Sequence, residues 1–242
     1  MNTRNKSHLL LLSLLVLVMS FAAPALATDS TADSALAALA QQKASTLVND
    51  LGVTSVQYAV ISNGEIILSG HAGVYSRTDD RPITADTMYG IGSTSKVFTT
   101  AAIMILVDSG KVALDAPVTE YIPEFTMADP RYRQITVRML LNHSSGLMGS
   151  TFRNAFLYND PDQAARDMLL ADLASQRLKA APGEFSVYCN DGFTLAELVV
   201  ERVSGESLTD FIRHNITVPL GMANTATPAP PSLLALPANW VR

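Results

Sequence analysis

The chain has 242 residues, of which 48% are hydrophobic and 16% are charged, and its formal net charge at neutral pH is -5. This length and composition suit one globular domain with a sizeable core. The mildly acidic balance excludes the basic patch that a nucleic-acid partner needs, and the single cysteine, Cys189, excludes an intrachain disulfide.

The first 27 residues have the three-part layout of a secretory signal peptide. Arg4 and Lys6 give a short basic start, residues 9–21 form an apolar or small-residue run, and residues 25–27 supply the small-x-small pattern that a signal peptidase cuts. The run is too short to span a bilayer stably, and an uncleaved N-terminal anchor is the alternative interpretation. We expect an exported protein, periplasmic or extracellular, with no transmembrane segment after cleavage.

The mature chain is expected to open with a helix followed by a β-hairpin. Residues 34–50 are rich in Ala and Leu and end at a Gly-containing stretch, which is typical of a helix terminus. Residues 55–62 alternate apolar with small or polar side chains, and residues 65–68 are again β-prone. Asn63 and Gly64 between them predict a tight turn, because both turn positions must accept positive φ. An isolated hairpin is poorly stable, so we expect it to belong to a larger sheet.

Several helices are predicted in the rest of the chain. The longest covers residues 93–109 and ends at Gly110, and its apolar side chains surround so much of the axis that we expect it to be central and buried. The others are 135–142 with Thr136 as N-cap, 162–178, a helix from 192 or 193 to 203, and 208–214 capped by Ser207. Residues 225–242 contain four prolines without periodicity, which indicates a loop or linker.

Ser93 and Lys96 form a Ser-x-x-Lys pattern at the head of the longest helix. Residues three apart on a helix share a face, so the hydroxyl and the amine can meet. A serine becomes a strong nucleophile when a base removes its proton, and a lysine can be that base only when it is neutral. Burial and the positive end of the helix dipole both disfavour the ammonium, and the Ser93 N–H would face a developing oxyanion. A capping serine beside a solvated lysine is the structural alternative.

Tyr188, Cys189 and Asn190 form a second candidate site, between a turn at residues 182–183 and the helix near residue 193. A tyrosine near a lysine can share its proton in acid–base steps, and an amide such as Asn190 can orient a substrate amide and the lysine together. A core tyrosine followed by a helix-capping Asn190 is the structural alternative. Cys189 is expected to be a small buried side chain, because no histidine is obviously placed to activate it.

Taken in order, these motifs resemble the serine β-lactamase-related family of penicillin-binding proteins, class C β-lactamases and D-alanyl-D-alanine carboxypeptidases. The matching segments are residues 92–96, 140–147, 182–183, 188–190, 203–205 and 219–222. The resemblance implies an α/β, β-lactamase/transpeptidase-like fold with a helical lobe and an antiparallel sheet. It also implies that Ser93 is acylated and that Lys96 is the base that activates it. Tyr188 would then be the acid–base partner, Asn190 would position the substrate, and His143 would be structural.

The function implied by the resemblance is acyl transfer from a small amide or ester to Ser93, followed by hydrolysis. No metal and no organic cofactor are implied. D-alanyl peptides, with peptidoglycan as their source, and β-lactams rank first as substrates, and short esters rank second. A non-catalytic cell-wall-binding protein or a defunct fragment is the rival from another class.

The sequence also departs from the family pattern. The family carries a Lys-Thr-Gly or His-x-Gly element on a later strand, and no such tripeptide follows Asn190. Because that strand supplies an oxyanion donor and a wall of the site, we expect reduced activity without it. We therefore expect an incomplete sheet and a C-terminally truncated chain, with a partial domain over residues 28–224 and a loop or truncated end over 225–242.

Overall fold

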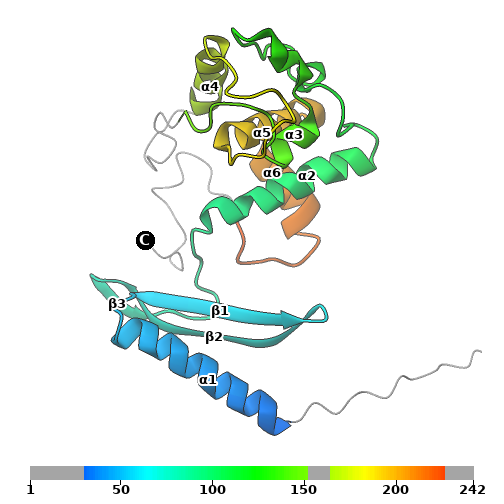
Figure 1. The fold of residues 1–242 in the computed structure, drawn as a ribbon. Coiled ribbons are helices and arrows are strands. Elements are labelled where there is room, and N and C mark those ends of the chain that lie inside the picture. Colours follow the sequence, from blue (N-terminus) through cyan, green and yellow to red (C-terminus); the bar gives the residue numbers. More distant parts are fainter. Residues whose placement is uncertain (1–29, 152–163, 227–242) are drawn as a thin grey trace, which may run out of the picture.

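The computed structural model describes residues 30–151 and 164–226, which form a small α/β layer and a helical lobe (Figure 1). The helix α1 (Ser30–Asn49) lies along one face of a three-stranded sheet, and the remaining helices lie beyond the sheet's other face. The predicted signal peptide and most of the predicted C-terminal loop are outside the described residues. Within the described ranges, no helix is both long and apolar enough to cross a membrane.

The sheet is antiparallel with strand order β1-β2-β3, and the predicted hairpin forms its first two strands. β1 (Ser55–Ser62) pairs along its whole length with β2 (Glu65–Ser76). The φ angles of Asn63 and Gly64 are 52° and 83°, so both turn residues have the positive φ that was predicted. β2 is longer than expected and pairs with β3 (Asp79–Pro82), a strand that the sequence did not predict because its polar residues lack the β-prone pattern.

The contact between α1 and the sheet centres on Tyr58 and Gly70. These two residues are cross-strand partners, and a Cβ atom at position 70 would lie only 2.3 Å from the Tyr58 hydroxyl oxygen. Glycine is therefore required for the tyrosine ring to lie across β2. The Tyr58 hydroxyl then donates to Gln41 Oε1 of α1 at 3.0 Å, which ties the helix to the sheet.

The helical lobe contains the helices that the sequence predicted, with boundaries shifted by a few residues. They are α2 (Lys96–Asp108), α3 (Val137–Leu141), α4 (Ala164–Ala174), α5 (Asn190–Ser204) and α6 (Leu208–Ile212). Short 3-10 helices cover Gly92–Ser95, Val118–Glu120 and Pro130–Gln134, and a π-helical turn covers Arg213–Thr217. The predicted caps are confirmed: Thr136 Oγ1 accepts from the Met139 N–H at 3.3 Å, and Ser207 Oγ accepts from the Asp210 N–H at 3.1 Å.

The centre of the lobe is formed by α2 and α5, which pack against each other. Ile103 of α2 and Leu195 and Val199 of α5 are fully buried in one contiguous hydrophobic core. The expectation that the long apolar helix is central and buried holds for one face of α2 only. The side chains of Val97 and Met104 are 65% and 43% exposed, because only one face of α2 packs against the lobe.

Candidate active site

Ser93 lies in the 3-10 helix that leads into α2, and Lys96 is the first residue of α2. Gly92 has a φ of 52°, and Ser95 Oγ donates to the Gly92 carbonyl at 2.7 Å, which closes this tight turn. The turn replaces the first turn of the predicted α-helix, but the two side chains still meet. Lys96 Nζ donates to Ser93 Oγ at 3.2 Å. Ser93 is exposed and Lys96 is only partly buried, so the dry environment expected for the lysine is incomplete in the described structure.

Tyr188 and Asn190 reach the same lysine from the start of α5 and the segment just before it. Lys96 Nζ donates to the Tyr188 hydroxyl oxygen and to Asn190 Oδ1, each at 2.6 Å. The Tyr188 hydroxyl in turn donates to Ser93 Oγ at 2.5 Å. The structure therefore brings together all four residues that the sequence singled out. The lysine faces three oxygen atoms, which matches the three N–H donors of an ammonium group.

The segment that carries Tyr188 is fixed to the turn that follows α3. The Val187 N–H donates to the His143 carbonyl at 2.9 Å, and Ser186 Oγ donates to the Asn142 carbonyl at 2.8 Å. A third bond, 2.7 Å long, joins the Gly183 N–H to the Ser144 carbonyl. These bonds hold the segment so that the Tyr188 hydroxyl meets Lys96 and Ser93 at the start of α2.

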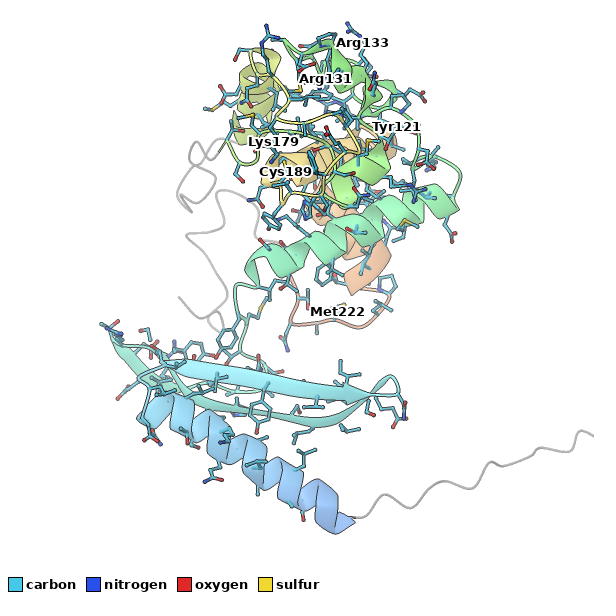
Figure 2. All side chains as sticks on the ribbon, in the orientation of Figure 1. Tyr121, Arg131, Arg133, Lys179, Cys189 and Met222 are labelled. Carbon is cyan, nitrogen blue, oxygen red and sulfur yellow. The ribbon has the colours of Figure 1, made fainter. Side chains whose placement is uncertain are left out.

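Cys189 is the last residue of this segment and directly precedes α5. Its Sγ atom accepts from the Gly192 N–H at 3.4 Å and donates to the Gly149 carbonyl at 3.1 Å. Cys189 is therefore the N-cap of α5, and Asn190, the alternative cap, is instead the first residue of the helix. The cysteine is 1% exposed, as expected for a small buried side chain, and burial raises the pKa of its thiol. Figure 2 shows it inside the helical lobe.

Two residues that the sequence did not single out hold Asn190 in place. The Asn190 amide Nδ2 donates to Ser150 Oγ at 2.9 Å, which leaves its Oδ1 to face Lys96. The Asp191 carboxylate, which is buried, accepts from the Thr151 N–H at 2.9 and 3.1 Å and so attaches the loop of Ser150 to α5. No spacing or periodicity marked these residues, because the loop and the helix meet only in the folded chain.

The charge of the site is concentrated at Lys96. Its hydrogen bond, followed by that of Ser93, lowers the pKa of Tyr188 and so favours the phenolate. Burial, followed by the positive charge of Lys96, lowers the pKa of His143. These shifts have the same physical cause as those in sites that perform acid–base chemistry at neutral pH.

A cavity of about 520 Å³ opens beside the nucleophile candidate and could admit a small substrate. Its surface is mainly apolar, and it is lined by Ser93, Lys96, Val97, Thr100, Ala101, His143, Tyr188 and Phe193. In the part of the chain that the structure describes, no group of three or more His, Cys, Asp or Glu side chains could hold a metal ion. The cavity therefore places the serine, the lysine and the tyrosine together on one accessible surface.

Comparison with known proteins connects this site to a family. The family model described as Beta-lactamase matches residues 38–241. The chain is 32% identical over 166 residues to penicillin-binding protein 4* of Bacillus subtilis (strain 168), which covers 67% of this chain and 35% of that protein. It is 33% identical over 190 residues to esterase EstB of Burkholderia gladioli, and the match covers 74% of this chain and 48% of that esterase. The chain thus spans about a third to a half of the length of these curated relatives.

The fold itself agrees with solved structures. A class C β-lactamase superposes with a TM-score of 0.71 at 23% identity, over 89% of this chain and 56% of that one. The family match covers both the α/β layer and the helical lobe, and it includes every residue of the candidate site. The chain therefore belongs to the β-lactamase family and has a β-lactamase/transpeptidase-like fold.

Proposed function

We propose that this chain carries the acylation machinery of a serine hydrolase, with Ser93 as the nucleophile. The observation that carries the proposal is the close arrangement of Ser93 Oγ, the Tyr188 hydroxyl and Lys96 Nζ, with separations of 2.5, 2.6 and 3.2 Å. A serine, a group that can take its proton and a group that orients that base are the parts that nucleophilic catalysis requires. A structural serine cap would need neither the tyrosine nor the lysine.

In the proposed reaction, the Ser93 oxygen attacks the carbonyl carbon of a small amide or ester. For this step Tyr188 is the phenolate, which its lowered pKa favours. The serine proton passes to the phenolate oxygen as the Oγ–C bond forms, and Tyr188 then donates that proton to the leaving amine or alcohol as the C–N or C–O bond breaks. Water hydrolyses the resulting ester at Ser93 by the same route in reverse. Lys96 stabilises the phenolate as an ammonium, because three oxygens surround its Nζ. A neutral Lys96 that takes the serine proton itself is the alternative.

D-alanyl peptides and β-lactams are the proposed first substrate class, with peptidoglycan as the source of such peptides. The support is the similarity to penicillin-binding protein 4* and to the D-alanyl-D-alanine-carboxypeptidase/endopeptidase AmpH of Escherichia coli (strain K12), 29% identical over 187 residues. Short esters are the second class, which the similarity to esterase EstB supports. Export is part of the proposal, because the first 27 residues have the pattern of a signal peptide.

The proposal is tested by mass spectrometry of the purified chain after exposure to a fluorescent penicillin and, separately, to an activated fluorophosphonate. Ser93→Ala removes the proposed nucleophile, and Ser175→Ala is the matched control, because Ser175 is an exposed serine of the same lobe whose hydroxyl bonds to the Asp172 carbonyl. An adduct at Ser93 with both reagents supports a β-lactam-recognising hydrolase. An adduct with the fluorophosphonate alone supports the esterase. A folded chain that forms no adduct refutes the proposed activity and favours a binding role.

A further inference from the structure

His143 lies against the ring of Tyr188, in the turn after α3, and the family resemblance implied only a structural role for it. Its φ is 64°, in the left-handed region that non-glycine residues adopt rarely. Backbone strain of this kind persists when the surrounding contacts fix it, and it is found often at functional sites. The contacts of His143 therefore indicate which part of the site the strained backbone conformation serves.

Three consecutive residues around the proposed acid–base group are held by this one histidine. The Val187 N–H donates to the His143 carbonyl at 2.9 Å, and the Cys189 N–H donates to His143 Nδ1 at 3.2 Å. Between them, the Tyr188 ring lies against the imidazole, with centroids 4.7 Å apart and planes inclined at 41°. The Phe193 ring of α5 also packs against the imidazole, with ring centroids 5.2 Å apart.

We propose that His143 is a positioning residue, which holds the Tyr188 hydroxyl between Lys96 and Ser93 through its Nδ1 acceptor and its ring. This inference rests on the proposed function, in which Tyr188 transfers the proton. His143 bonds to the backbone on both sides of Tyr188 and does not hydrogen-bond to Ser93 or Lys96 in the described contacts. The positions of the ring and the backbone together determine where the phenol oxygen lies.

The arrangement requires a neutral imidazole. Because Nδ1 accepts the Cys189 N–H, the neutral ring carries its proton on Nε2, and protonation at Nδ1 would break that bond. The titratable side chains that face the ring are Lys96 from α2 and Tyr188 from the segment before α5. Cys189 contributes only its backbone N–H, and α5 presents Phe193. Burial and the charge of Lys96 lower the pKa of His143, so the neutral form persists below its ordinary titration range.

The first test uses the unmodified chain and does not depend on activity. Tyrosine labelled with carbon-13 at Cζ is followed by NMR while the pH is lowered through the titration of His143, and Tyr188→Phe identifies the signal of Tyr188 among the seven tyrosines. If His143 positions Tyr188, the Tyr188 signal shifts together with the protonation of His143. A Tyr188 signal that stays constant while His143 titrates overturns the proposal.

The second test uses two variants that separate the functions of the ring. His143→Phe keeps a ring but removes the acceptor, whereas His143→Asn keeps an amide acceptor, tolerates positive φ and removes the ring. In His143→Phe we expect the pKa of Tyr188 to rise towards its ordinary value and the rate of Ser93 labelling by fluorophosphonate to fall by about 10- to 100-fold. His214→Phe, an exposed histidine of the same lobe, is the matched control.

The two proposals fail in different ways. Adduct formation at Ser93 that is equally fast in folded wild-type, His143→Phe and His143→Asn chains overturns the positioning role and leaves the hydrolase intact. A wild-type chain without any adduct, whose Tyr188 signal nevertheless follows His143, refutes the hydrolase and leaves the positioning intact. In a Tyr188→Phe background, a positioning residue causes no further loss of rate, whereas an independent effect of the His143 variants would be additive.

Discussion

Replacing Lys96 by methionine removes the one charge around which the candidate site is built. Methionine has a similar length but no donor, so it deletes the three hydrogen bonds from Nζ to Ser93, Tyr188 and Asn190. The bond to Tyr188 is the largest cause that lowers the pKa of its phenol, so its loss moves that pKa back towards its ordinary value. Acid–base assistance is worth about 10²- to 10⁴-fold, so we expect the labelling rate of Ser93 to fall by at least about 100-fold.

The assay is the time course of Ser93 labelling by fluorophosphonate, read by mass spectrometry at saturating reagent. Thermal unfolding is measured in parallel, and we expect little change, because Lys96 is only partly buried. Lys111→Met, which removes an exposed lysine after the other end of α2, is the control for a general effect of charge. A Lys96→Met chain that is labelled within about threefold of the wild-type rate would refute the assignment of Lys96 and the acid–base pathway based on it.

Three other perturbations test the surroundings of the site. Gly146→Ala adds a Cβ that would lie 2.5 Å from the Ala180 carbonyl oxygen, at a residue whose φ is 77°. The free energy of unfolding measured in urea should therefore fall by about 2–4 kcal/mol. Gly90→Ala is the control, because a Cβ at that position has open space around it. The hydrogen-bonded guanidinium of Arg131 lowers the pKa of Asp129. The stability that this carboxylate contributes is therefore present above about pH 4 and is lost as the pH falls further. Asp129→Asn should flatten that part of the stability–pH curve. Asp191→Ala frees the loop that holds the Asn190 amide and should slow Ser93 labelling about tenfold, whereas Asp191→Asn, which keeps an acceptor, should not.

The local signals in the sequence account for much of the fold. The turn at Asn63 and Gly64 was predicted because only residues that accept positive φ fit there, and Thr136 and Ser207 cap their helices through bonds that depend on neighbouring residues alone. β3 and the exposed face of α2 were not predicted. Both depend on what lies beside them in space, which a single element's composition does not specify.

The candidate site shows the same division between local and long-range information. Ser93 and Lys96 are three residues apart, so their contact follows from helical geometry. The contact of Lys96 with Asn190 spans 94 positions, and the sequence could indicate it only through the order of motifs that resemble a known family. Ser150 and Asp191 were missed because their roles arise from the attachment of a loop to α5, which leaves no periodic pattern.

All four candidate residues come from the helical lobe. Ser93 and Lys96 lie at the start of α2, and Tyr188 and Asn190 lie at the start of α5. These two helices share the buried core, so their relative position is set by close packing rather than by the sheet. The separation between the serine and its proton acceptor therefore depends on the α2–α5 contact as well as on the turn of His143 that holds Tyr188. Substitutions in that contact should change the rate of acylation, whereas substitutions in the hairpin should change stability without altering the geometry at Ser93.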